Sequence, residues 1–240
     1  MNPVLILTHN CLELTKRCVE SVRAQDIETY LRIFDNGSTD GTREWLEQNW
    51  CESDYKFTWS CHDLNTPTNK GVSYAWNHNL SMFFDPGSSC DGSHVLVINN
   101  DTILPPWFYR ELLACNVPFV TGATSRDINA VMESPIISLT DGPDFSAFLI
   151  QREAWRKIGP FDESMVHYCS DIDYDIRARA LGITLYNSHV KFYHERSSTI
   201  RLASEEDRAA IQQRSNLDHE AFRKKYGCLP KDYEWCSPSN

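Results

Sequence analysis

Short apolar runs alternate with helical patterns over roughly the first hundred residues. Between the runs, apolar residues recur at helical spacing in 11–24, after the helix-capping residues 38–40, and in 71–83. The order strand, helix, strand predicts a mostly parallel sheet with helices on both faces. The predicted strands of this part are 4–8, 31–35, 56–60 and 94–98.

The second half is less regular, and no repeat or linker divides it from the first. Residues 124–142 are polar with a few β-branched positions, which predicts loops and short strands. The other predicted strands are 117–121, 145–150 and 190–194. The predicted helices are 107–114, 152–158, 171–181 and 204–226. The whole pattern predicts a single α/β domain with a C-terminal helical extension.

Polar clusters follow three of the predicted strands directly. They are Thr8–Asn10, Asp35–Ser38 and Asn99–Asp101. In an open parallel sheet, ligands bind in the crevice beyond the carboxyl ends of the strands. The three clusters therefore predict a polar ligand site at one edge of the sheet.

Composition and charge narrow the class of protein. The 240 residues are 41% hydrophobic and carry a formal charge of -10. This apolar content is enough for a packed core, and the acidity disfavours non-specific binding to polyanions. No apolar stretch approaches the length of a membrane helix, and the N-terminus lacks a signal-peptide pattern. Nine cysteines without a C-x-x-C pair indicate reduced thiols. We expect a soluble cytoplasmic protein.

The cluster Asn99–Asp101 has the chemistry of a cation site. A carboxylate flanked by amides suits a hard divalent cation, which is typically held by one or two carboxylates and the substrate's phosphates. The alternative is an Asx turn that closes the strand. The chain has no P-loop and no G-x-G-x-x-G, which argues against an ATPase or a simple dinucleotide fold.

Two further positions are candidates for chemistry. Asp171 falls in the first turn of a predicted helix, where a carboxylate either serves a reaction or stabilises the helix dipole. Asp175 lies one turn further along and is placed to pair with Arg179. His194 ends a predicted strand, where a histidine can bind a metal, act as a general base or simply lie at the surface.

Taken together, these segments resemble the family 2 glycosyltransferases of the GT-A fold, especially the rhamnosyltransferase-like branch. Seven motifs follow in the family's order over roughly residues 3–200. They are Val4–Asn10, Phe34–Thr42, Asn69–Gly71 with Ala75 and Asn77, Leu96–Asp101, Phe148–Ile150 with Gly159–Glu163, Asp171–Asp173 with Arg177 and Gly182, and His194. The resemblance implies a Rossmann-like sheet and transfer of a sugar from a nucleotide donor.

The resemblance implies a nucleotide-sugar site. Asp35 would accept a hydrogen bond from a pyrimidine N3–H, which implies a UDP- or dTDP-sugar. Gly71 would let the backbone approach the donor closely. The residues implied for this site are Thr8, Asn10, Asp35, Asn69, Lys70, Gly71, Asn99 and Asn100.

The resemblance also implies a metal and a base. Asp101, with His194, would bind Mn²⁺ or Mg²⁺ and so stabilise the leaving diphosphate. Asp171 matches the catalytic base of inverting members, while Asp173 and Ser170 would support the acceptor. The chain departs from the family at Asn99, where the motif often has Asp, and at Ser170, where an acid commonly precedes the base.

The sequence thus predicts an inverting, metal-dependent glycosyltransferase. Residues 1–101 would bind the donor, 102–200 would carry the base and acceptor site, and 201–240 would form a helical tail. Two alternatives stay open: an inactive GT-A-like nucleotide- or glycan-binding module, and a sugar nucleotidyltransferase.

The sequence does not identify the acceptor. A glycan, lipopolysaccharide or modified nucleic acid would each supply a hydroxyl. Segment 191–231 has nine Lys or Arg against six Asp or Glu. This positive stretch is either a contact for an anionic acceptor or membrane surface, or a mixed-charge helix in solvent.

Overall fold

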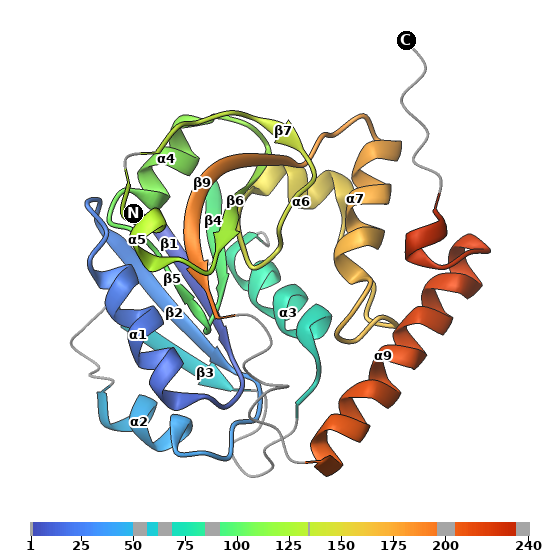
Figure 1. Cartoon of the computed structure of the whole chain (residues 1–240), viewed down its shortest axis with the longest axis horizontal. Coiled ribbons are helices and arrows are strands. Elements are labelled where there is room, and N and C mark those ends of the chain that lie inside the picture. Colours follow the sequence, from blue (N-terminus) through green and yellow to red (C-terminus); the bar gives the residue numbers. More distant parts are fainter. Residues whose placement is uncertain are drawn as a thin grey trace.

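In the computed structural model, a central sheet has helices on both faces (Figure 1). The structure describes residues 2–49, 57–61, 69–84, 92–133, 135–195 and 205–233. The strands are β1 Asn2–Thr8, β2 Thr29–Asp35, β3 Phe57–Cys61, β4 His94–Asn99, β5 Thr102–Ile103, β6 Phe119–Ser125, β7 Thr140–Asp141, β8 Ala147–Gln151 and β9 Tyr186–His194. The helices are α1 Leu12–Arg23, α2 Thr42–Asn49, α3 Val72–Phe84, α4 Phe108–Ala114, α5 Ile128–Val131, α6 Arg152–Ile158, α7 Ser170–Ala180 and α9 Glu205–Tyr226, with a 3₁₀ turn at Pro230–Asp232.

The nine strands form one mixed sheet in the order β3-β2-β1-β4-β8-β6-β9-β5, with β7 also paired to β9. Its first four strands are parallel, as the alternating pattern predicts. β8 then runs antiparallel to both β4 and β6, whereas β6 and β9 are parallel. The α/β fold expected from the sequence is confirmed, with a sheet that is parallel only in part.

Both faces of the sheet are buried, because successive side chains of a strand point to opposite sides. Val4 and Ile6 face α1 and α4, in a cluster with Val19 and Phe108. Leu5 and Leu7 face the other side, where α3, α6 and α7 supply a second cluster rich in aromatic residues. Two buried faces explain why β1 and β4 are apolar without interruption.

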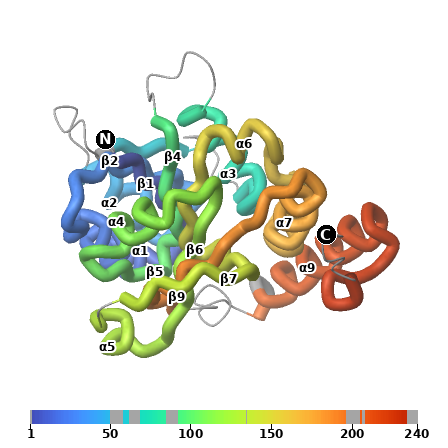
Figure 2. The backbone as a smooth tube through the Cα atoms, turned by 90° about the horizontal axis from the view of Figure 1, so that it is seen from above, coloured from blue at the N-terminus to red at the C-terminus, as the bar shows by residue number. Residues whose placement is uncertain are grey.

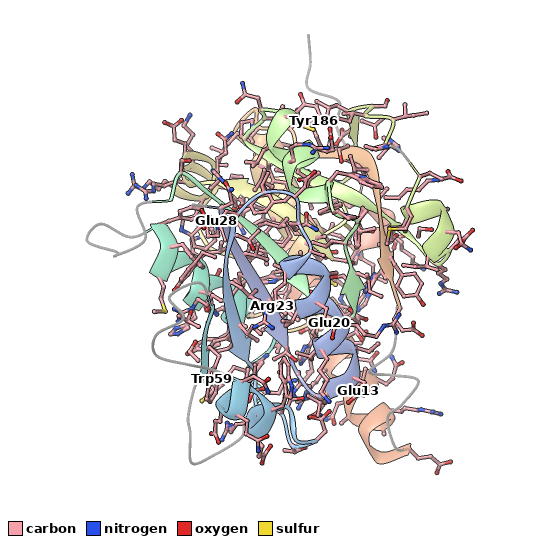
Figure 3. The ribbon with its side chains drawn as sticks, turned by 90° about the vertical axis from the view of Figure 1, so that its left-hand side faces the viewer. Glu13, Glu20, Arg23, Glu28, Trp59 and Tyr186 are labelled. Carbon is pink, nitrogen blue, oxygen red and sulfur yellow. The ribbon has the colours of Figure 1, made fainter. Side chains whose placement is uncertain are left out.

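Helix α1 shows how the helices cover the sheet. Its inner face buries Cys18, Val19 and Val22. Its outer face carries Glu13, Glu20 and Arg23, which Figure 3 shows on the side turned away from the sheet. This apolar stripe at helical spacing is the pattern from which the sequence predicts the helix.

The predicted helices after residue 100 are all present, while two short elements go beyond the prediction. The segment 124–142, expected as loops and short strands, contains the short strand β7 but also helix α5, and the unpredicted strand β5 pairs with the end of β9. Strands of two residues leave no periodic signal, because their partners rather than their own sequence define them.

Helix α9 lies at one end of the molecule beside α7 in both views (Figures 1 and 2). Phe222 is fully buried against Met165, Cys169 and Ile176. Tyr226 donates a hydrogen bond to the carboxylate of Asp173 on α7 at 2.7 Å. Within the described residues, no helix is both long enough and apolar enough to cross a bilayer.

Candidate active site

The carboxyl ends of three strands meet at one edge of the sheet, as the polar clusters predict. Thr8 at the end of β1 is paired in register with Asp35 at the end of β2. Asn99 at the end of β4 is paired with Leu7. Asn10 and Cys11 follow β1 in the left-handed conformation, with φ of 57° and 62°. Such backbone strain is common where a turn positions functional groups.

Asp35 is fully buried at this edge. Its Oδ1 accepts a hydrogen bond from the Ser38 N–H at 3.0 Å. Its Oδ2 lies 3.5 Å from Nε of Arg43 and makes no hydrogen bond within the described part of the chain. A buried carboxylate oxygen normally has a hydrogen-bond donor, so Oδ2 is suited to accept one from a ligand.

Asn36 belongs to the predicted polar cluster Asp35–Ser38, but the sequence assigned it no role of its own. Its Nδ2 donates to Oδ1 of Asn69 and to the carbonyl of Gly71, both at 3.1 Å. Its Oδ1 accepts from the Lys70 N–H at 3.1 Å. The buried Asn36 side chain therefore fixes the segment 69–71 against the end of β2, whereas the Lys70 side chain is exposed.

Gly71 is tightly packed against protein. It has φ of 92°, and a Cβ there would lie 2.2 Å from Cγ1 and 2.6 Å from the carbonyl oxygen of Val166. The Val72 N–H donates to that same carbonyl at 2.8 Å. From the resemblance, we expect the backbone at Gly71 to approach the donor. In the structure, Gly71 is in close contact with Val166, in the segment before α7.

Asn100 faces inward. Its Nδ2 lies within hydrogen-bond distance of the Thr8 hydroxyl, the Thr15 hydroxyl and the Asn10 carbonyl, at 2.9–3.0 Å. These contacts use its amide protons to join the ends of β4 and β1. Thr8 is itself fully buried and contacts the Thr15 hydroxyl at 2.9 Å. Asn100 and Thr8 therefore shape the crevice from behind its surface.

Asp101 and His194 lie together, although they are 93 positions apart in the sequence. Oδ1 of Asp101 is 3.1 Å from Nε2 of His194, and each side chain is 13% exposed. The pairing of Thr102 with His194 between β5 and β9 brings them together. Two adjacent ligands of a six-coordinate cation at about 2.1 Å lie about 3 Å apart. The pair therefore fits two neighbouring positions around one Mn²⁺ or Mg²⁺.

Protein ligands beyond this pair are not evident. No group of three or more His, Cys, Asp or Glu side chains with the geometry of a metal site occurs among the residues that the structure describes. A cation at Asp101 and His194 would need oxygen ligands from a substrate or from water, which is how Mg²⁺ is usually bound.

A cavity of about 530 Å³ connects the end of β4 to the start of α7. Asn99, Ser170 and Asp171 line it, whereas the other residues predicted for the donor and the metal are not among its lining residues. The other lining residues are Val72, Trp76, Gly142, Pro143, Asp144, Phe145, Ser146, His167 and Asn187. The volume is in the range of small-molecule binding sites.

Asp171 lies at the first turn of α7, where Oδ1 accepts a hydrogen bond from the Ile172 N–H at 2.9 Å. Burial raises the pKa of its carboxyl, and the nearby charge of Asp144 raises this pKa further. Asp144 is a cavity residue that the sequence patterns did not indicate, because it lies in a loop without a motif. A raised pKa makes Asp171 a stronger proton acceptor than an ordinary aspartate.

Asp173 lies outside the cavity lining, in contrast to its expected place near the acceptor. Its carboxylate is fully buried and contacts Nε of Arg177 at 2.8 Å, the Tyr226 hydroxyl at 2.7 Å and Nζ of Lys225 at 2.6 Å. Residues two positions apart on a helix point to different sides, so Asp173 faces α9 whereas Asp171 faces the cavity. The expected pair of Asp175 with Arg179 is present at 3.2 Å.

Residues 4–114 match the family model described as glycosyl transferase family 2. No curated protein sequence matches the chain. Solved structures of glycosyltransferases share its fold at low sequence identity. The mannosyltransferase PcManGT from Pyrobaculum calidifontis, in complex with GDP-Man and Mn²⁺, is 18% identical, with a TM-score of 0.54 over 80% of this chain and 56% of that one.

Two further structures are similar. GalNAc-T7 with UDP, GalNAc and Mn²⁺ is 11% identical, with a TM-score of 0.63 over 81% of this chain and 43% of that one. S. aureus TarS 1–349 in complex with UDP-GlcNAc is 14% identical, with a TM-score of 0.59 over 97% of this chain and 74% of that one. The chain therefore spans about half the length of the first two proteins. Its fold is that of the GT-A glycosyltransferases.

Proposed function

We propose that this chain is a metal-dependent, inverting glycosyltransferase that moves a sugar from a nucleotide-diphosphate donor to an acceptor hydroxyl. The observation that carries the proposal is the cavity that joins Asn99, at the end of β4, to Asp171, at the start of α7. One side of the cavity carries Asn99, and another carries the Asp171 carboxylate, whose pKa is raised. The match of residues 4–114 to glycosyl transferase family 2 supports the same reaction.

The donor's base would lie over Asp35. Its Oδ2 is buried and suited to accept a hydrogen bond from N3–H of uracil or thymine, which cytosine lacks. This favours a UDP- or dTDP-sugar, and the UDP complexes of TarS and GalNAc-T7 are consistent with it. Asn10 and the segment 69–71 make hydrogen bonds to the turn 36–39 that follows Asp35, so they would lie beside the bound donor. Asn99 in place of the usual Asp supports a place in the rhamnosyltransferase-like branch.

Asp101 and His194 would hold the cation, Mn²⁺ or Mg²⁺, against the donor diphosphate. When bound, such a cation offsets the negative charge that develops on the leaving diphosphate. Mn²⁺ accompanies the nucleotide in the PcManGT and GalNAc-T7 structures. The 3.1 Å separation of the two side chains supports this assignment.

Asp171 would act as the base. Its carboxylate takes the proton of the acceptor hydroxyl while that oxygen attacks the anomeric carbon and the bond from sugar to phosphate breaks. Burial keeps water from competing for the carboxylate, and general-base catalysis contributes about 10²–10⁴-fold. Ser170, 2% exposed, is placed in the cavity lining to contact the acceptor.

We place this reaction in the cytoplasm. Nine cysteines without a C-x-x-C pair suit a reducing compartment, and Cys18, Cys115, Cys169 and Cys228 carry free thiols. We propose that residues up to 101 bind the donor, while residues 102–200 supply the base and the acceptor site. We propose a glycan, lipopolysaccharide or modified nucleic acid as the acceptor, and an acceptor screen distinguishes these three.

The test is hydrolysis of UDP-, dTDP-, GDP- and CDP-sugars with Mn²⁺, followed by acceptor screening with the preferred donor. The substitution Asp171→Asn should lower transfer to an acceptor by about 10²–10⁴-fold while nucleotide binding persists. Asp175→Asn is the matched control, because Asp175 is on the same helix but pairs with Arg179 outside the cavity lining. Transfer by Asp171→Asn at the control's rate would refute the base assignment. Tight nucleotide binding without any turnover would indicate a binding module instead.

A further inference from the structure

The carboxylate of Asp218 on α9 is buried in an otherwise mostly exposed stretch of helix. Its side chain is 1% exposed, whereas Leu217 beside it is 57% exposed. Oδ1 accepts a hydrogen bond from the Val166 N–H at 2.8 Å. Oδ2 accepts two more, from the N–H groups of His167 and Tyr168, both at 2.9 Å. One side chain thus binds three consecutive backbone amides.

These three amides belong to a segment without regular structure, residues 162–169, that leads into α7. A loop has no helix or strand partner for its N–H groups, and buried N–H groups need an acceptor. Hydrogen bonds to an ionised carboxylate are shorter and stronger than neutral ones. Asp218 therefore determines where the backbone of 166–168 lies.

The same segment contacts the donor half of the site. The carbonyl of Val166 accepts from the Val72 N–H at 2.8 Å, and Val166 fills the space beside Gly71. The Ser73 hydroxyl donates to the carbonyl of Met165 at 2.5 Å. A shift of Val166 would therefore move the start of α3 and the turn at Gly71.

Toward its other end, the segment enters the catalytic wall of the cavity. His167 lines the cavity, and its Nε2 lies 3.4 Å from a guanidinium nitrogen of Arg214 on α9. Cys169 then takes the left-handed conformation, with φ of 65°, and α7 begins with Ser170 and Asp171. Only four residues lie between Val166 and Asp171, so the position of the loop determines the position of the base.

We propose that Asp218 is a positioning residue of the transfer reaction: by binding the amides of 166–168, it fixes the loop that contacts Gly71 at one point and leads to Asp171 in the cavity lining at its end. The proposal rests on the proposed function for its catalytic part. Helix α9 begins eleven positions after the end of β9, and through Asp218 it becomes part of the active site.

The decisive variant is Asp218→Asn, which keeps the size of the side chain but replaces one accepting oxygen with an NH₂ donor. Tyr226→Phe is the matched control. It removes one hydrogen bond between α9 and α7, at Asp173, and leaves 166–168 untouched. Phe222 packs at the same interface in both variants, so α9 should stay docked. Urea unfolding of the full chain reports the stability of each.

Hydrogen exchange measures the loop directly and needs no substrate. In Asp218→Asn, the amides of 166–168 should exchange at least about tenfold faster than in Tyr226→Phe. Unchanged exchange would overturn the proposal. This result stands even if the wild-type chain hydrolyses no nucleotide sugar, an outcome that would count against the proposed function alone.

Turnover measures the consequence. Relative to Tyr226→Phe, Asp218→Asn should lower kcat for donor hydrolysis or transfer at least about tenfold. It should also weaken UDP binding, because Val166 contacts Gly71 of the donor site. In Asp218→Asn, the acid limb of the pH–kcat profile should move to lower pH, because greater exposure of Asp171 to water lowers the pKa of its carboxyl. The variant Asp218→Glu, which keeps the charge, should recover part of kcat. Faster exchange with an unchanged kcat would show that Asp218 only stabilises the loop.

Discussion

The contact between Gly71 and Val166 gives the sharpest test of how the two halves of the site are joined. In Gly71→Ala, the new Cβ would lie 2.2 Å from a side-chain carbon and 2.6 Å from the backbone oxygen of Val166. The carbonyl cannot rotate away freely, because it accepts the Val72 N–H at 2.8 Å. The backbone of one of the two segments must therefore move.

The cost has two parts. A residue with a Cβ at positive φ costs about 1–2 kcal/mol, and Gly71 has φ of 92°. Forcing an extra carbon into a packed position costs about 1–3 kcal/mol more. We expect Gly71→Ala to lower the free energy of unfolding by about 2–5 kcal/mol, which leaves a typical domain folded. Gly182→Ala is the control, because Gly182 has φ of 71° and no atom within 4 Å of its Cβ position. It should lose only about 1–2 kcal/mol.

Urea unfolding of both variants measures this difference, and donor hydrolysis measures its effect on the site. Gly71→Ala should also lower kcat, since displacing Val166 moves His167 and the approach to Asp171. Gly182→Ala, at the far end of α7, should keep the wild-type kcat. Equal losses in the free energy of unfolding of the two variants would show that Val166 moves away from the new Cβ at little cost. The linkage of the two halves through this contact would then be wrong.

Three further outcomes follow from the site. In calorimetry, Asp101→Ala should weaken nucleotide-diphosphate binding at least about tenfold with Mn²⁺ and leave it unchanged without Mn²⁺. Equal affinities of the wild type with and without metal would exclude the cation site. Asp35→Asn should abolish a preference for UDP over CDP that we expect to be at least about tenfold in the wild type, and a preserved preference would refute base recognition by Asp35. Because burial raises the pKa of Asp171, its protonated and inactive form persists to higher pH, so activity is lost as the pH falls through a value above the ordinary aspartate value of about 3.9. An acid limb of kcat/KM at or below that value would contradict the assignment.

The donor half of the site could be predicted because its signals are local. An apolar run such as Val4–Leu7 that is followed at once by polar residues predicts both a buried strand and a ligand-facing end. The register of β1 with β2 then places Thr8 beside Asp35 without further information. The role of Asn36 could not be predicted, because its amide fixes the segment 69–71, more than thirty positions away in the sequence.

The catalytic half depends on contacts that no local pattern reports. β8 enters the sheet antiparallel between β4 and β6, which brings the loop with Asp144 to the cavity. Asp171 and Asp173 are two positions apart on one helix, and the sequence predicts the base at the first and acceptor support at the second. Packing separates them: Asp171 lines the cavity, while Asp173 binds side chains of α9. The docking of α9 therefore determines which face of α7 meets the cavity.

The docking of α9 also changes the meaning of the positive charge in segment 191–231. Lys225 pairs with Asp162 and Asp173, both at 2.6 Å, and Arg214 contacts His167 at 3.4 Å. These cations are directed at the protein, so they hold the helix in place instead of forming a surface for an anionic acceptor. Arg223 and Lys224 remain exposed in the last turn of α9, away from these contacts. An electrostatic role in acceptor binding, which salt-dependent turnover would reveal, is open to Arg223, Lys224 and the exposed Lys231, whereas the buried Asp218 couples the helix to catalysis.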